Sequence, residues 1–584
     1  MLGYIFFGAL SAILVWLAFS IYKARNDIAK TIGNTSTASI LALGALVAFF
    51  IAFSLLYVHP AEQLFFDENI YQGIAINILH SGNAEWCQYG TGLLTKCYYS
   101  VIYHDPVGYP FILSIAFYLF GIGIGTAYST QLLMGALSIF LFFIMSKAVY
   151  ERSDVAATST AAFTFIPSLY IWSRTEAVLD LPFMTFSILA FLAFVVFIRR
   201  QNKYTFSLFL SALAFVMYIR IEALLLVVIF AVLYLVYGED SAKRNVKRNI
   251  SRALHALDYN TWTNALIIIF LMLVAPELFF VAMQYAHPNY GQVGPLPFSL
   301  ADFWKNVRPN FYYLLGEYNS INNYPAVFPQ VLTFLAVIGL IYLLLVGKNL
   351  KLGLALPGLW FLTYELFYDF YYAGAATYGV DSRFMLQINP AMALLGGIGI
   401  IAISDALSNY RLIRAVMLRR NMLIEPSRYV SRYRMQIAAV TIAISVAIFL
   451  IYPFYTLLPN VTILPSNMPQ QIIVHPTQTF LYGNYSKVPA NCLVFSLTPD
   501  IWYELNRSAA QMSFLVSPNA TFVNNTKSYT CHVLDYGYWC VVPPYHNTIC
   551  SYILSHYDLK PIALQYPQNP TSGAGIYMIM NYSN

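Results

Sequence analysis

Acidic and basic side chains recur in short clusters between the apolar stretches of this sequence. Asp67 and Glu68 form the first cluster, and we expect them to be catalytic. Guanidinium groups bind phosphate oxygens in a fork geometry, and a carboxylate can take a proton from an acceptor hydroxyl. The pattern therefore favours a reaction on a lipid-linked phosphate. The residues expected to bind substrate are His104, Asp105, Arg174, Glu176, Arg220, Glu222 and Arg383.

Each cluster also has a structural interpretation. Two pairs can be ion pairs that only tie helix ends together. These pairs are Arg174 with Glu176 and Arg220 with Glu222. Asp67 and Glu68 can instead favour the first turn of a helix that follows them, because acidic residues are stabilising there. His104 beside Asp105 can be simple loop polarity. No residue is assigned as a metal ligand.

The composition places these clusters in a membrane protein. Only 10% of the 584 residues are charged and 59% are hydrophobic, with a mean hydropathy of +0.60. Soluble domains carry about 25% charged residues. Charged groups near membrane depth are costly and usually functional. We therefore expect an all-α polytopic bundle, with a small α/β domain at the C-terminus and no nucleic-acid partner.

Apolar stretches of about 20 residues, the length that crosses a bilayer, recur along the first 458 positions. Twelve spans are expected, at about 3–22, 38–58, 126–148, 154–172, 178–198, 204–219, 223–238, 262–283, 327–346, 352–371, 384–404 and 435–458. The segment 106–122 begins with Pro106 and Pro110 and ends among glycines, so it is expected to be an interfacial helix.

The basic residues set the expected orientation, because positively charged loops stay cytoplasmic. With the N-terminus outside, 22 of the 32 Lys and Arg residues fall in cytoplasmic loops. Four groups of charged residues then reach the outer face: the loop residues from Asp67 to Asp105, the turn from Arg174 to Glu176 with Asp180, the turn from Arg220 to Glu222, and the segment from Asp381 to Arg383. The expected divisions are an extra helix and loop at 1–37, a catalytic membrane domain at 38–458 with an outer loop at 59–105, and an extracytoplasmic domain at 459–584.

All six cysteines fall in regions expected to be outside. Cys87 and Cys97 lie in the first loop, and we expect them to form a disulfide with each other. The other four lie in the tail and predict two more disulfides. The tail also contains six Asn-x-Ser/Thr sequons, at Asn460, Asn484, Asn506, Asn519, Asn524 and Asn581. Together these features predict a multi-pass plasma-membrane protein, with an archaeal source favoured by the sequons.

The order of these motifs resembles the type C glycosyltransferase superfamily, in particular the branch with the dolichyl-phosphate-mannose protein mannosyltransferases and the aminoarabinose lipid A transferases. The resemblance rests on four features within roughly 38–405. These are Asp67-Glu68, the sequence His104-Asp105-Pro106-Val-Gly-Tyr-Pro110, the turn Arg174-Thr-Glu176, and Arg383-Phe384 ahead of Pro390. No single motif identifies the superfamily. The resemblance rests on the order of the four features along the chain.

The resemblance implies transfer of a sugar from a polyprenyl phosphate carrier to a protein, glycan or lipid acceptor at the outer membrane face. Asp67 matches the loop carboxylate of the family, and Arg383 matches an arginine expected near the carrier phosphate. One position departs from the pattern. The aminoarabinose branch has a phosphate-binding lysine before the helix-opening proline, where this chain has Asp105.

Two other functions are compatible with the sequence. Leu534-Asp535-Tyr536-Gly537 is similar to part of the acceptor motif of oligosaccharyltransferases, although both tryptophans before the Asp are missing. That function would add a divalent metal, and otherwise no cofactor is expected. A transporter or flippase of lipid-linked sugars is the alternative outside the enzymes, since charges within a membrane also mark transport pathways. The charges here gather at one face, which favours an enzyme.

Overall fold

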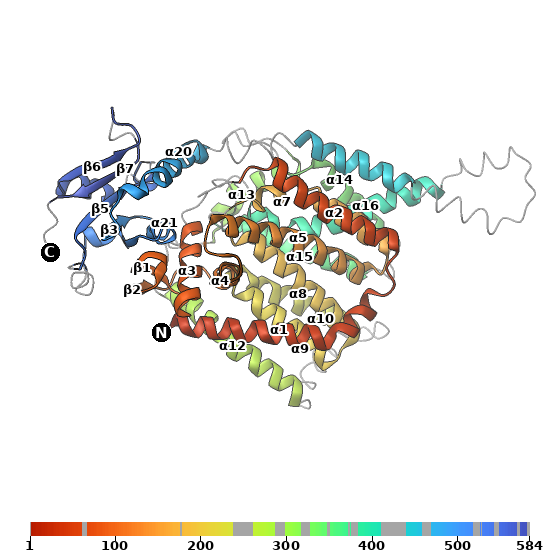
Figure 1. Cartoon of the computed structure of the whole chain (residues 1–584). Helices are drawn as coiled ribbons and strands as arrows, with labels where there is room; N and C mark the ends of the chain where they lie inside the picture. The colour runs from red at the N-terminus through yellow and green to blue at the C-terminus, as the bar shows by residue number, and fades with distance from the viewer. Residues whose placement is uncertain are drawn as a thin grey trace, which may run out of the picture.

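The computed structural model is a helical bundle with a small sheet at one end (Figure 1). It describes residues 2–60, 67–175, 178–237, 261–286, 298–316, 327–346, 351–371, 374, 383–409, 440–457, 469–517, 526, 528–541, 548–568 and 573–580. Some expected residues lie outside the described part of the chain: Glu176, Asn460, Asn519, Asn524, Asn581 and the basic loops at 239–258 and 411–434.

The expected fold class, a mostly helical membrane bundle with a small sheet region, is confirmed.

Seven helices in this described part are long and apolar enough to cross a membrane. They are α1 (Leu2–Ile32), α2 (Thr37–Tyr57), α5 (Ile124–Tyr150), α8 (Asp180–Arg200), α12 (Thr261–Ala286), α16 (Asn389–Asn409) and a helix at Val440–Leu457. Further helices are α9 (Lys203–Met217), α10 (Leu224–Tyr237), α13 (Leu300–Leu314), α14 (Gln330–Val346) and α15 (Lys351–Phe370). The count of twelve spans stays a prediction.

One expected span differs from the structure. The stretch expected as a single helix over 154–172 is divided into α6 (Ser153–Thr164) and α7 (Pro167–Trp172). Pro167 has no backbone N–H and restricts Ile166 to extended backbone, so the helix ends before it. The short helix α7 then ends at Trp172 in the protein core, and a turn follows it.

Two helices of the first loop region lie between the bundle and the sheet in Figure 1. These are α3 (Asp67–Ser81), which is buried along most of its length, and α4 (Gly108–Phe120), which packs against it. The backbone N–H of Gly108 donates to the carbonyl of Tyr218 at 2.6 Å. This contact ties the start of α4 to the end of α9.

The sheet joins two regions that lie 400 residues apart in sequence. Its seven strands are ordered β2-β1-β4-β3-β5-β7-β6. The first loop provides β1 (Trp86–Gly90) and β2 (Cys97–Val101). The tail provides β3 (Cys492–Ser496), β4 (Ser508–Gln511), β5 (Cys531–Tyr536), β6 (Leu559–Leu564) and β7 (Gly575–Ile579). Since β1 pairs antiparallel with β4, the loop hairpin extends the sheet of the tail.

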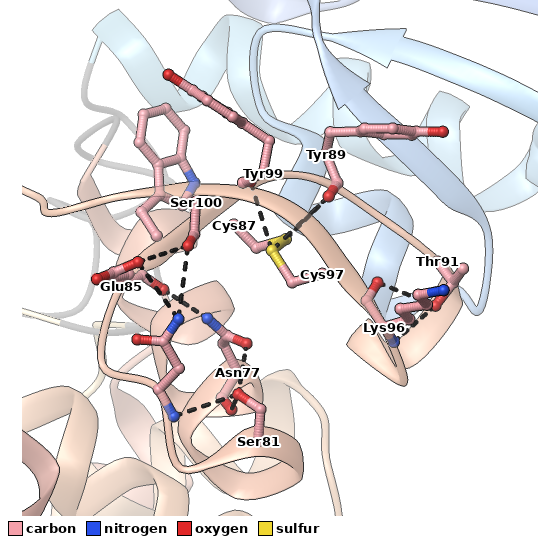
Figure 2. The surroundings of a disulfide bond; sticks show 12 residues. Asn77, Ser81, Glu85, Cys87, Tyr89, Thr91, Lys96, Cys97, Tyr99 and Ser100 are labelled. Carbon is pink, nitrogen blue, oxygen red and sulfur yellow. Dashed lines mark hydrogen bonds between the residues drawn. A yellow bond between two sulfur atoms is a disulfide. The ribbon is translucent and has the colours of Figure 1, made fainter. Parts of the chain in front are cut away.

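Disulfides hold both parts of this sheet. Cys87 and Cys97 join β1 to β2, as the sequence predicts (Figure 2). The tail contains the other two bonds, Cys492–Cys531 and Cys540–Cys550. In Figure 2, Glu85 lies beside the hairpin, where its carboxylate accepts a hydrogen bond from Ser100 at 2.6 Å and its carbonyl accepts one from Asn77 of α3 at 2.8 Å. The hairpin is therefore fixed to α3 as well as to the tail.

Candidate active site

Asp67 is the first residue of α3, and its side chain is held by a tertiary contact. The phenol of Tyr103, which follows β2, donates a hydrogen bond to Asp67 Oδ1. Burial raises the pKa of Asp67 above its usual value, and the nearby charge of Asp105 raises it further. His104, Tyr103 and Arg383 act in the opposite direction. Asp67 thus lies in the first turn of a helix, as the structural interpretation predicts, but it also takes part in a network beyond that helix.

His104 and Asp105 lie next to Asp67 in space. His104 Nε2 is 3.6 Å from Asp105 Oδ2, and the phenol of Tyr71 donates to the same oxygen. One ligand atom each from Asp67, His104 and Asp105 lie within 4.8 Å of one another. We call these three residues the loop cluster. Oxygen and imidazole ligands at this spacing could hold a divalent cation such as Mn²⁺ or Zn²⁺.

A second group of charges lies at helix ends. Asp180 begins α8, and Arg220 and Glu222 lie at the turn between α9 and α10. Arg220 makes an ion pair with Asp180, and its Nη2 is 2.7 Å from Glu222 Oε1 while its Nε donates to Oε2 at 3.0 Å. Both carboxylates are buried. The arginine is therefore a clamp between two helix ends, as the ion-pair interpretation of Arg220 and Glu222 predicts.

Arg383 extends this group from the opposite side. It precedes the short 3₁₀ helix Phe384–Gln387 that leads into α16, and its Nε is 3.9 Å from Asp180 Oδ2. The guanidinium groups of Arg383 and Arg220 lie 5.0 and 5.2 Å from the ring centroid of Phe384. We call Asp180, Arg220, Glu222 and Arg383 the helix-end cluster.

The two clusters lie within electrostatic reach of each other. The charge of Arg383 acts on Asp67, and that of Asp105 acts on Arg220. Charged residues from separate segments of the chain therefore come together here, whereas the roles expected for them stay predictions. The structure also shows how Tyr71, Tyr103 and Asp180 from the same segments contact them.

Two expected site residues, Glu68 and Arg174, are not members of either cluster. Glu68 is buried in the first turn of α3, next to Asp67. Arg174 donates its Nε to the carbonyl of Val58 at 3.4 Å and stacks over Tyr128, with no carboxylate partner among the described residues. Its expected partner, Glu176, lies outside those residues. The ion pair between Arg174 and Glu176 stays a prediction.

A buried contact from the tail lies close to the loop cluster. Asp500 of α21 (Pro499–Glu504) accepts a hydrogen bond from the indole of Trp86 at 3.0 Å. The Trp86 ring packs edge-on against Tyr103, with centroids 5.9 Å apart, and Tyr103 in turn donates to Asp67. Asp500 also lies against Gly73 of α3, where a Cβ would be 1.7 Å from its Oδ1. Only glycine permits this approach of α21 to α3.

Sequence reasoning missed two buried acids near the site. Asp500 follows a proline at the start of a short helix. Acidic residues are common at that position because they stabilise the first turn, so the local sequence does not mark Asp500 as functional. Glu277 did carry a signal, because it is the single acid in the apolar helix α12 and such charges are rarely placed without a function. It is buried, and it acts electrostatically on Tyr218.

Comparison with known proteins adds a family match and a fold. Residues 104–280 match the family model described as dolichyl-phosphate-mannose-protein mannosyltransferase. No curated protein matches the chain. ArnT from Cupriavidus metallidurans bound to undecaprenyl phosphate is similar at a TM-score of 0.56 and 13% identity, over 94% of this chain and 99% of that one.

The apo state of ArnT from the same organism gives a TM-score of 0.54 and 12% identity, over 93% of this chain and 98% of that one. The archaeal oligosaccharyltransferase AglB from Archaeoglobus fulgidus is similar at a TM-score of 0.46 and 12% identity, over 85% of this chain and 69% of that one. The resemblance inferred from the motifs is therefore confirmed: the chain has the type C glycosyltransferase fold, and its residues 104–280 match the mannosyltransferase family.

Proposed function

We propose that this protein is a membrane glycosyltransferase that moves a sugar from a polyprenyl phosphate carrier to an acceptor at the loop cluster. The observation that carries the proposal is the placement of Asp67, a carboxylate oriented by Tyr103 and within electrostatic reach of Arg383. The family match over residues 104–280 and the fold shared with ArnT, which binds undecaprenyl phosphate, support it.

The proposed reaction begins with the acceptor. An acceptor hydroxyl lies against Asp67, and its oxygen attacks the anomeric carbon of the sugar. The bond between that carbon and the phosphate oxygen breaks, and its electron pair stays on the phosphate. The hydroxyl proton passes to the carboxylate of Asp67, which Tyr103 orients by donating to Oδ1. Burial makes this carboxylate a better proton acceptor than an exposed aspartate, since it raises the pKa of Asp67.

The leaving phosphate requires a cation close to the loop cluster. Arg220 is bonded to two carboxylates, so its donors are largely occupied. The charge of Arg383 acts on Asp67, and 19% of the Arg383 side chain is exposed. We therefore assign Arg383 to the carrier phosphate and Arg220 to holding Asp180 and Glu222 in place. A planar guanidinium can meet two phosphate oxygens at once.

A donor assay tests the proposal. Purified protein is incubated with radiolabelled polyprenyl phosphate sugars, hexoses and pentoses, beginning with dolichyl phosphate mannose. We expect one of them to lose its sugar, and Arg383→Ala to raise the KM for that donor more than tenfold. Arg308→Ala is the matched control, because Arg308 lies on α13 and stacks over Tyr312 at 5.3 Å. The assignment is refuted if no donor loses its sugar, or if both variants behave alike.

A second candidate is an oligosaccharyltransferase-like enzyme that uses a divalent metal. The convergence of Asp67, His104 and Asp105 favours it, because this ligand set suits a cation. A metal chelator separates the two candidates. Unchanged turnover after chelation fits the metal-independent transferase. Loss of turnover that Mn²⁺ restores, with transfer of a whole oligosaccharide, would favour the second candidate instead.

The proposed reaction also requires a particular side of the membrane. We propose that the protein spans the plasma membrane several times and that its tail lies outside the cell. The cysteines of the described residues are all in disulfides, so introduced thiols can be labelled selectively. An impermeant maleimide should label Ser528→Cys in intact cells and should leave Asn34→Cys unlabelled until the membrane is opened. The reverse pattern would invert the topology.

A further inference from the structure

The end of the bundle away from the loop cluster contains a polar hollow. Its volume is about 480 Å³, and it lies where α1, α5 and α8 end. Four basic side chains and one acid line it: Lys30, Lys147, Arg199, Arg200 and Glu151. This volume falls in the range of small-molecule sites, and a surplus of cations favours an anion. None of these residues takes part in the proposed sugar transfer.

The backbone around the hollow is shaped by three helix caps. α1, α5 and α8 are each followed by a residue in the left-handed conformation: Gly33 at φ 64°, Glu151 at φ 61° and Gln201 at φ 42°. Only glycine adopts this conformation without strain, so its use by Glu151 and Gln201 is uncommon. The caps turn the chain sharply and bring three basic helix ends around one space.

Two of the four cations are occupied by the helix ends themselves. Lys147 is buried and donates to the carbonyl of Glu151 at 2.7 Å. Arg199 donates to the carbonyl of Val149 at 3.0 Å and makes an ion pair with Glu151. These contacts neutralise the carbonyls and the partial negative charge at the end of α5. Helix capping therefore accounts for this pair of cations.

The other two cations are not explained by capping. Arg200 donates only its Nε, at 3.2 Å, to the hydroxyl of Thr31, which itself donates to the carbonyl of Asp27 at 2.7 Å. This contact fixes the guanidinium while its two terminal nitrogens have no hydrogen-bond partner among the described residues. Lys30 has no partner among them either. An oriented guanidinium beside an ammonium is the arrangement that binds phosphate.

The surroundings indicate a lipid as the source of that phosphate. Ile40 and Leu41, in the first turns of α2, are 54% and 69% exposed although both are apolar. Residues of this kind at the end of a membrane helix face acyl chains, so the hollow lies at the depth of the headgroups. We propose that it binds the phosphate of an anionic phospholipid, as basic pockets between membrane helices do.

Lipid retention tests this proposal independently of enzyme activity. Delipidated protein is mixed with phosphatidylglycerol or phosphatidylcholine, and bound lipids are counted by native mass spectrometry. We expect the parent protein to retain one phosphatidylglycerol about 25-fold better than the double variant Lys30→Gln with Arg200→Gln does, at about fivefold per basic residue. Both substituted residues are exposed, so the variant should fold, and thermal unfolding checks this.

A double variant with the same change of charge serves as the control. Lys23→Gln with Arg25→Gln alters two exposed cations of α1 that do not line the hollow, and it should retain phosphatidylglycerol like the parent. Equal losses in the two double variants, or no preference over phosphatidylcholine, would overturn the proposal. Stabilisation by inorganic phosphate without retention of phosphatidylglycerol would also overturn it, because the ligand would then be a free anion.

Discussion

The loop cluster and the helix-end cluster lie within reach of each other but balance their charges in different ways. In the helix-end cluster, two buried carboxylates share Arg220 and lie near Arg383. In the loop cluster, two carboxylates accept hydrogen bonds from the phenols of Tyr71 and Tyr103, with His104 beside them and Arg383 within electrostatic reach of Asp67. A phenol donates a hydrogen bond but brings no positive charge. Burial and the nearby charge of Asp105 raise the pKa of Asp67, so this carboxylate is suited to accept a proton.

This difference suits the helix-end cluster to stabilising the fold and the loop cluster to proton transfer. A compensated buried ion pair resists change, because removing one partner leaves an unpaired buried charge. A carboxylate crowded by another carboxylate is the usual design of a proton acceptor. The supports differ too: the helix-end cluster is held by membrane helices, whereas the loop cluster is held by the β1–β2 hairpin and the tail. Each of the following changes should therefore affect one cluster more than the other.

The largest expected effect is on turnover in the Asp67→Asn variant. Asparagine keeps the shape of the side chain and can still accept from Tyr103, but it cannot take a proton. Sugar transfer should fall by ~10²–10⁴, the usual contribution of a general base. Asp302→Asn, in the first turn of α13, is the control and should transfer sugar normally. Turnover of folded Asp67→Asn within threefold of the parent would show that the loop cluster is not the reactive one.

Replacing Arg220 should affect stability. In Arg220→Met the aliphatic volume is kept, but Asp180 and Glu222 lose their shared partner inside the protein. The expected loss is about 3–5 kcal/mol, seen as a lower midpoint of thermal unfolding or a poor yield of folded protein. A variant of unchanged stability with impaired donor binding would contradict the comparison, because Arg220 would then serve the substrate.

Opening the Cys87–Cys97 disulfide should act locally. The double variant Cys87→Ser with Cys97→Ser removes a constraint worth about 2–4 kcal/mol from a hairpin that supports the loop cluster. We expect faster proteolytic cleavage in the hairpin and lower turnover, while the helical bundle unfolds near the temperature of the parent. Cys540→Ser with Cys550→Ser, a pair with the same separation of 10 residues, is the control. Similar turnover in both double variants would show that the hairpin does not support the site.

The smallest expected effect is on the pH dependence of the contact between tail and loop. Burial raises the pKa of Asp500 to about 8, although the hydrogen bond from Trp86 opposes this. Because the folded pKa exceeds the ordinary value near 3.8, the neutral form favours folding, and its contribution is lost as the pH rises toward about 8. Thermal unfolding of Asp500→Asn should therefore change less between pH 5 and 8.5 than that of the parent. Parallel pH curves for the two proteins would refute the assignment.

Some of the site could be predicted because its signals are local. Charges such as Asp67 and Arg383 stand out against an apolar background, since burying them in a bilayer without a function is costly. The Cys87–Cys97 bond could be predicted because its partners lie ten residues apart, isolated from the other four. Tyr103 and Trp86 could not be recognised as parts of the site. Aromatic residues are abundant here, and their roles depend on which partner the fold brings to them.

The sequence by itself determined the membrane bundle, the location of the charged segments and the partition of cysteines between loop and tail. Hydropathy and the spacing of charges act over one helix or one loop, so they can be read without a fold. The tertiary structure alone decided that β1 pairs with β4, that Asp500 meets Trp86 across more than 400 residues, and that Arg220 is bonded to two carboxylates whereas Asp67 accepts from the phenol of Tyr103. These outcomes depend on which distant surfaces pack together, because a strand edge, an indole or a guanidinium can satisfy its hydrogen bonds with many partners.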